Sequence, residues 1–124
     1  MAKHNTLGRW GEQIAREYLI ADGYAIFAVD KNMVFTDIDI VAMKDNEVAF
    51  VEVKTRRESS TDPEEVVDKR KRARMVRAAD MLIRSYKLLH EPRYDIIIVN
   101  GSPETGHTVT HYPDAFLPPL SSTY

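Results

Sequence analysis

Two apolar segments separated by a short polar stretch constrain the fold of this chain more than any other feature. Residues 34–42 and 48–54 are rich in β-branched and aromatic side chains, and the polar stretch 44–47 lies between them. This pattern predicts an antiparallel β-hairpin with its turn in the polar stretch. Residues that pair across a hairpin are equally distant from the centre of its turn, so Asp39 is expected close to opposite Glu52.

Apolar periodicity elsewhere predicts two helices and three more strands. The helices are expected at residues 7–22 and 62–89, the second with a break near Asp68, and the strands at residues 24–29, 94–100 and 108–112. The first three strands then form an antiparallel meander, and the glycine-bounded segment 101–106 forms the turn between the last two. This element order predicts an α/β sheet with helices packed on it. We expect one domain, residues 1–116, followed by a tail with prolines and serines, residues 117–124.

Composition excludes several classes of function. The chain of 124 residues has no cysteine, which excludes disulfide scaffolds, thiolate zinc sites and cysteine nucleophiles. Its apolar runs are far shorter than the ~20 residues that span a bilayer, and its first residues contain no apolar signal-peptide core. We therefore expect a cytoplasmic protein without a membrane partner. His107 and His111 are four positions apart on a predicted strand, too far to share a metal ion.

Residues 69–77 concentrate positive charge in a chain whose net charge is −2. Six of these nine residues are Lys or Arg and none is acidic. Helical spacing aligns Arg70, Arg74 and Arg77 in one stripe, and it directs Lys71 toward the edge of the sheet. Two interpretations stay open: a stripe that binds phosphates, and a solvated helix face.

Acidic residues interrupt both strands of the predicted hairpin. Carboxylates as close as Asp39 and Glu52 repel each other unless a positive charge lies between them. A hard divalent cation such as Mg²⁺ is one solution, and Lys54, two positions after Glu52, is another. Glu12 lies on the helical stripe that faces the sheet, either at the same site or in an ion pair such as one with Lys54. The alternative to a site is a partly exposed strand with a Glu–Lys surface pair.

Three motifs in the chain resemble those of a known family. They are Leu7-Gly8-x-x-Gly11-Glu12, Asp37-Ile38-Asp39-Ile40-Val41-Ala42 and Val51-Glu52-Val53-Lys54-Thr55-Arg56. Over nearly its whole length the chain is similar to the YraN-like family of uncharacterised bacterial proteins. That family resembles archaeal Holliday-junction resolvases and the restriction-endonuclease-like PD-(D/E)xK nuclease superfamily. One departure is Asp37, because the family usually has Gly-Glu-Ile-Asp where this chain has Thr-Asp-Ile-Asp.

The resemblance implies a restriction-endonuclease-like αβββαβ core, with a mixed sheet flanked by helices. It implies Mg²⁺ or Mn²⁺ held by Asp39, Glu52 and the backbone carbonyl of Val53, with Glu12 helping directly or through a water. Lys54 would be the catalytic lysine. Nucleic-acid binding is expected of five basic residues: Arg56, Arg70, Lys71, Arg74 and Arg77.

The leading hypothesis is a metal-dependent endonuclease that acts on DNA rather than RNA, branched or damaged DNA included. The resolvase-like relatives suggest a homodimer, since two symmetric cuts need two sites. A fold shared with nucleases does not prove turnover. Two alternatives therefore stay open: a catalytically silent nucleic-acid-binding or scaffold protein, and a housekeeping partner whose carboxylate cluster is a stability feature.

Overall fold

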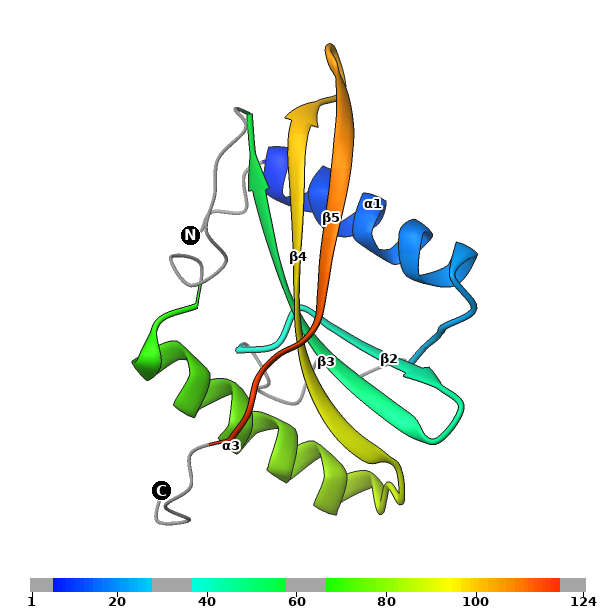
Figure 1. Ribbon diagram of the computed structural model, residues 1–124, viewed down its shortest axis with the longest axis vertical. Helices are drawn as coiled ribbons and strands as arrows, with labels where there is room; N and C mark the ends of the chain where they lie inside the picture. The colour runs from blue at the N-terminus through cyan, green and yellow to red at the C-terminus, as the bar shows by residue number, and fades with distance from the viewer. Residues whose placement is uncertain (1–5, 28–36, 58–66, 119–124) are drawn as a thin grey trace.

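The computed structural model describes residues 6–27, 37–57 and 67–118, which form two helices and one five-stranded sheet (Figure 1). In chain order the elements are α1 (Thr6–Ala21), β1 (Ala25–Ile26), β2 (Ile40–Lys44), β3 (Glu47–Arg56), α3 (Lys69–Tyr86), β4 (Glu91–Ser102) and β5 (Gly106–Phe116). The strands lie in the order β1-β2-β3-β4-β5, and the β3–β4 pair is parallel while the other pairs are antiparallel. The predicted α/β class, the mixed sheet and the order of the elements are confirmed.

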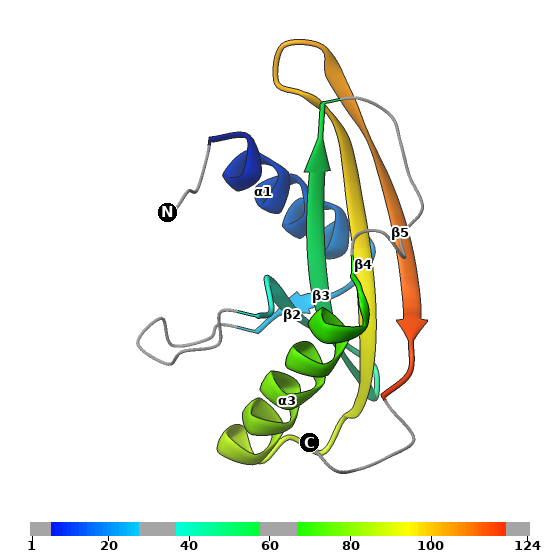
Figure 2. The same ribbon diagram turned by 90° about the vertical axis from the view of Figure 1, so that its left-hand side faces the viewer.

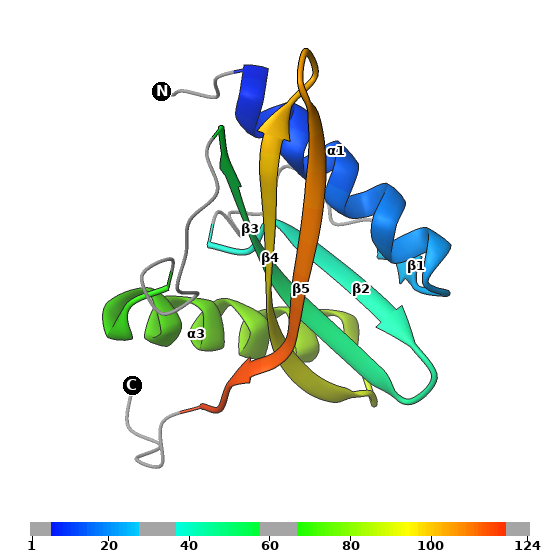
Figure 3. The same cartoon turned by 45° about the horizontal axis from the view of Figure 1, so that its top comes forward.

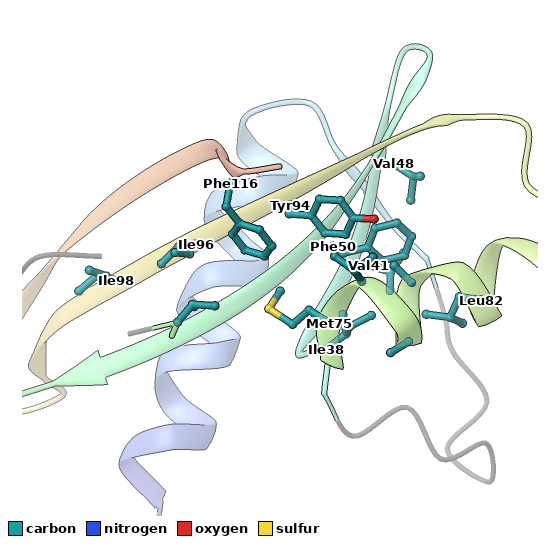
Figure 4. Packing of buried hydrophobic residues seen from close by; sticks show 14 residues of the cluster. Ile38, Val41, Val48, Phe50, Met75, Leu82, Tyr94, Ile96, Ile98 and Phe116 are labelled. Carbon is teal, nitrogen blue, oxygen red and sulfur yellow. The ribbon is translucent and has the colours of Figure 1, made fainter. Parts of the chain in front are cut away.

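Strand alternation divides the core into two clusters, one under each helix. Phe50 and its neighbours at alternate positions pack against α3, whereas Val51 and its neighbours pack against α1. Figure 4 shows Met75 and Leu82 of α3 on the side of the sheet that carries the rings of Phe50, Tyr94 and Phe116, with α1 behind the sheet. Along the strands, α1 and α3 lie toward opposite ends of β4 and β5 (Figure 3). Neither helix of the described residues is long and apolar enough to cross a membrane.

The β2–β3 hairpin has the predicted register. Ile40 pairs with Val51, and the Asp39 N–H donates to the Val51 carbonyl at 3.1 Å. Continued by one position, this register places Asp39 opposite Glu52, as the sequence predicts. β2 pairs with only the first half of β3, which runs on alongside β4 (Figures 1 and 2). Asp39 therefore lies where the hairpin opens.

The prediction of a regular strand up to this point is wrong at Ile38. Ile38 packs with Val41 in the cluster under α3, whereas alternation predicted that it would share a face with Ile40. The reason is that the chain bends at residues 37–39 and β2 begins only at Ile40. Residues 28–36, where the predicted end of the first strand and the start of the second fall, lie outside the described residues.

The predicted break near Asp68 is the start of α3. The Asp68 Oδ1 caps the helix by accepting a hydrogen bond from the Lys71 N–H at 2.8 Å. Residues 62–66, the start of the longer predicted helix, lie outside the described residues. The predicted end at 89 is wrong, because Lys87 adopts a left-handed conformation with φ 54° and ends α3 at Tyr86.

The last two strands are longer than predicted. β4 begins at Glu91, three residues before the predicted start, and includes Pro92. Pro92 fits because β4 pairs there only with β3, and β5 joins from Tyr94 onward. The segment between β4 and β5 is a hairpin turn, as predicted. Residues 119–124 of the predicted tail lie outside the described residues.

Candidate functional site

The opening of the β2–β3 hairpin brings Asp39 onto the free edge of β3. Its Oδ2 accepts a hydrogen bond from the Val53 N–H at 2.8 Å. The N–H and C=O of one residue in an antiparallel strand point to the same side. The Val53 carbonyl therefore faces the same edge as Asp39, where the described part of β2 provides no partner for it.

Glu52 projects from the face of β3 that α3 covers. Its side chain is 15% exposed, and its Oε1 is buried without a hydrogen bond. The Nζ of Lys71, from the first turn of α3, lies 3.5 Å from this oxygen, which makes an ion pair that lacks the geometry of a hydrogen bond. A buried carboxylate oxygen is therefore left with only a loose electrostatic partner.

The electrostatics of Asp39 and Glu52 are unfavourable when both carboxyls are ionised. Burial, followed by the negative charge of Asp39, raises the pKa of Glu52 to about 8. Burial also raises the pKa of Asp39, although the Val53 N–H acts in the opposite direction. Two buried carboxyls that resist ionisation, one with an orphaned oxygen, form a donor set that fits a hard divalent cation.

Glu12 approaches the same place from α1. Burial, followed by the charge of Asp39, raises its pKa, although the Glu12 side chain is still 37% exposed. Its ion-pair partner is Arg16 of its own helix, 3.9 Å away, and not Lys54. Within the described ranges, no three acidic or histidine side chains converge as a metal-binding group. Glu12 is therefore near the Asp39–Glu52 pair but not in position as a third direct ligand.

Gly11 explains how α1 comes so close to the strand that carries the motif. A Cβ atom at this position would lie 1.8 Å from Thr55 Oγ1. Any larger residue would push α1 away from β3, and with it the neighbouring Glu12.

The structure separates the two lysines of the candidate site. Lys54 lies on the same face of β3 as Glu52, but its side chain is exposed and makes no ion pair with any described residue. Lys71 is the lysine that contacts Glu52, as its predicted direction toward the sheet edge suggested.

The remaining basic candidates differ in their exposure and in whether they form an ion pair. Arg70 and Arg77 are exposed on α3, as a nucleic-acid-binding stripe requires. Arg74 is partly buried, because its Nε pairs with Asp37 Oδ1 at 3.3 Å. Arg56 is also partly buried, and its Nε is a buried donor without an acceptor. The stripe is therefore interrupted by an ion pair at Arg74.

A second polar cluster, which the sequence analysis missed, lies on the α1 side of the sheet. Asp95 is 0% exposed and accepts hydrogen bonds from Arg93 Nε at 2.9 Å, from Arg93 Nη2 at 2.8 Å and from the Asp114 N–H at 3.0 Å. His111 Nε2 lies 2.7 Å from Asp95 Oδ2, and Arg93 also bonds to Tyr24. These bonds lower the pKa of Asp95 although burial raises it.

The signal for this cluster in the sequence was the single acidic residue at the start of the apolar run of β4. Most members of the cluster could not be identified from local patterns, because Tyr24 lies just before β1 whereas His111 and Asp114 lie on β5. His107 packs instead against the edge of Trp10, with ring centroids 5.5 Å apart. The two histidines thus have separate partners.

The fold defines a structural class. The αβββαβ order and the mixed sheet are consistent with a restriction-endonuclease-like core. The chain belongs to the uncharacterised protein family UPF0102, whose family model matches residues 11–99. This confirms the resemblance to the YraN-like family, and the match includes Glu12 and the acidic motifs.

Relatives in this family match the chain from end to end. A UPF0102 protein of Bacteroides thetaiotaomicron is 43% identical over 97% of this chain and 99% of its own length. A UPF0102 protein of Parabacteroides distasonis is 39% identical over 96% of this chain and 98% of its own length. A UPF0102 protein of Flavobacterium psychrophilum is 38% identical over 94% of this chain and 98% of its own length.

Proposed function

We propose that this protein is a nuclease that uses Mg²⁺ or Mn²⁺ to cleave DNA phosphodiesters. The observation that carries the proposal is the position of Asp39 opposite Glu52 in the continued hairpin register, together with Glu52 Oε1, which is buried without a hydrogen bond. Burial raises the pKa of both carboxyls, so the pair is costly to ionise unless a cation compensates it.

The residues that would hold the cation are Asp39, Glu52 and the carbonyl of Val53, with Glu12 acting through water. A divalent cation at such a site supplies an activated water and stabilises charge on the transferring phosphate. Lys54, exposed on the same face two positions from Glu52, offsets the negative charge that develops on the phosphate. The exposed guanidinium groups of Arg70 and Arg77 bind the phosphate backbone on either side.

One observation favours the second candidate function, a nucleic-acid-binding protein that retains the nuclease fold without turnover. Glu12 pairs with Arg16, and no third acidic side chain of the described residues joins Asp39 and Glu52. A site with only two carboxylates binds divalent cations weakly. The two functions share a DNA-binding surface and differ in cleavage.

Cleavage should depend on Asp39. We expect the parent protein to nick linear or branched DNA in the presence of Mn²⁺ and to be silent in EDTA. Asp39→Asn removes a ligand and should reduce the rate by at least about 100-fold, the usual size of losing one group that stabilises the transition state. Gel assays on end-labelled duplex and four-way-junction DNA measure this.

The matched control is Asp45→Asn, which makes the same change at an exposed turn position with φ 55°, a conformation that Asn tolerates. It should cleave like the parent. DNA binding by the parent without any Mn²⁺-dependent cleavage would support the silent alternative, and equal cleavage by the parent and Asp39→Asn would contradict the assigned site.

The exposed arginines of α3 should bind DNA without sequence preference. Reversing Arg70 and Arg77 to Glu together should weaken binding to every DNA alike and reduce the dependence of log Kd on log salt by about two phosphate contacts. Fluorescence anisotropy between low and moderate salt measures both. Arg84→Glu, a single charge reversal near the other end of α3, is the control and should have little effect. Equal affinities and salt slopes for the parent and the double variant would make this stripe a solvated face.

A further inference from the structure

The cation that accompanies Glu52 in the structure comes from another element. Lys71 lies on α3, and its Nζ approaches Glu52 Oε1 to 3.5 Å. Its side chain is 22% exposed and that of Glu52 is 15% exposed, so the contact is largely shielded from water. Lys54, the lysine of the sequence motif, is exposed instead.

The position of Lys71 is fixed by the start of α3. The Lys71 N–H donates to the capping Asp68, which sets the first turn of the helix. One turn later Arg74 pairs with Asp37, just before β2. Two basic side chains of α3 thus reach the acidic residues at the opening of the hairpin, and Lys71 is the one that reaches the buried pair.

The ammonium group of Lys71 lies within ion-pair distance of Glu52 but does not have the geometry of a hydrogen bond to it. The oxygen that faces the ammonium group accepts no hydrogen bond from it. A lysine stem has four rotatable carbons, so the ammonium group can move aside while the stem keeps its packing. A divalent cation and an ammonium group cannot share one carboxylate oxygen without repelling each other.

We propose that Lys71 is an exchangeable counter-ion of the Asp39–Glu52 pair, which occupies Glu52 in the metal-free protein and withdraws when a divalent cation binds. This inference rests on the metal site of the proposed function and adds a residue that regulates its affinity. Lys71 is a positioning residue in this scheme and not a catalytic one. Because Lys71 and the metal compete for Glu52, removing the ammonium group should tighten metal binding at a pH where Glu52 is ionised in both proteins.

Calorimetric titration of Mn²⁺ into the chelator-treated protein tests the exchange. Lys71→Met keeps the apolar stem and removes the charge, and it should bind Mn²⁺ at least about fivefold more tightly than the parent, the lower end of usual coupling between two sites. Lys71→Arg keeps the charge and should restore an affinity close to that of the parent. Lys54→Met removes a neighbouring charge that does not touch Glu52 and should change the affinity less than Lys71→Met.

A second readout follows the ammonium group itself. In ¹H–¹⁵N spectra of the lysine side chains, saturating Mg²⁺, which is diamagnetic, should shift the Lys71 Nζ resonance more than that of Lys54. A purely structural lysine would keep its environment and its resonance.

The outcomes separate this inference from the proposed function. If the parent binds Mn²⁺ and Lys71→Met binds it equally or more weakly, the exchange is wrong and the metal site stands. If Lys54→Met tightens binding as much as Lys71→Met, the effect is general electrostatics and the exchange is again wrong. If the parent binds no Mn²⁺, both the metal site and the exchange fail. Tighter binding by Lys71→Met without any DNA cleavage supports the exchange and rejects the nuclease.

Discussion

Glu52→Gln should make the metal-free protein more stable in alkaline solution than the parent. Burial and the charge of Asp39 raise the pKa of Glu52 to about 8 from the ordinary 4.5. Below pH 4.5 the carboxyl is protonated in both the folded and the unfolded chain and has no effect. Between the two values the unfolded chain releases the proton and the folded chain keeps it, so the free energy of unfolding falls by up to about 1.4 kcal/mol per pH unit. Above pH 8 the loss is complete.

Urea unfolding in EDTA at pH 5.5 and pH 8.5 measures this loss. The parent should be several kcal/mol less stable at the higher pH, whereas Glu52→Gln should lose much less. Asp95 does not contribute in this window, because its hydrogen bonds lower its pKa and it is ionised throughout. Glu91→Gln, at an exposed position of β4, is the control and should behave like the parent. A parent with equal stability at the two pH values would contradict the buried, repulsive environment described for Glu52.

Asp95→Asn should be the most destabilising single substitution on the α1 side of the sheet. The asparagine would present an NH₂ group where the carboxylate now accepts from Arg93 and His111. It would also remove the charge that compensates Arg93, whose side chain is only 13% exposed. Breaking a buried ion pair by removing one partner costs about 3–5 kcal/mol. Urea unfolding at pH 7 in EDTA provides the value.

The same arginine supplies the control for this experiment. Arg93 Nη1 also pairs with Glu47 Oε1 at 2.8 Å, but the Glu47 side chain is 50% exposed. Glu47→Gln should therefore cost less than about 1 kcal/mol, the usual value of a surface ion pair. Similar losses in the free energy of unfolding for the two variants would show that burial does not determine how much each ion pair stabilises the fold. A loss below about 1 kcal/mol for Asp95→Asn would contradict the structural role of Asp95.

The parts of this structure that the sequence predicted are those determined by neighbouring residues. The polar turn and the alternation on both sides of it were sufficient to place Asp39 opposite Glu52, and the capping ability of Asp68 indicated a break in the predicted helix at the residue where α3 begins. The errors arose where distant residues decide. Ile38 leaves the strand pattern to fill the core under α3, and β4 continues through Pro92 because β5 starts later.

The candidate site shows the same division. Asp39, Glu52 and Lys54 could be located from strand alternation, because all three belong to one hairpin. The contact of Lys71 with Glu52, the ion pair of Glu12 with Arg16 and the bonds of Asp95 depend on how the helices and β5 pack on the sheet. Periodicity indicates which face a side chain occupies, and it does not indicate which of several partners it meets there.

The parallel pairing of β3 with β4 also has a consequence for the order in which the chain folds. A tight hairpin such as β2–β3 forms within microseconds, whereas a parallel pair must wait for a crossover, here the one that contains α3. The two carboxylates are therefore brought together by the most local part of the chain, and Lys71 reaches them only when α3 docks. We expect the early hairpin to be held back by the repulsion of its own acidic pair, so that lowering the pH to about 4, where exposed carboxyls begin to take up protons, should accelerate refolding of the chain.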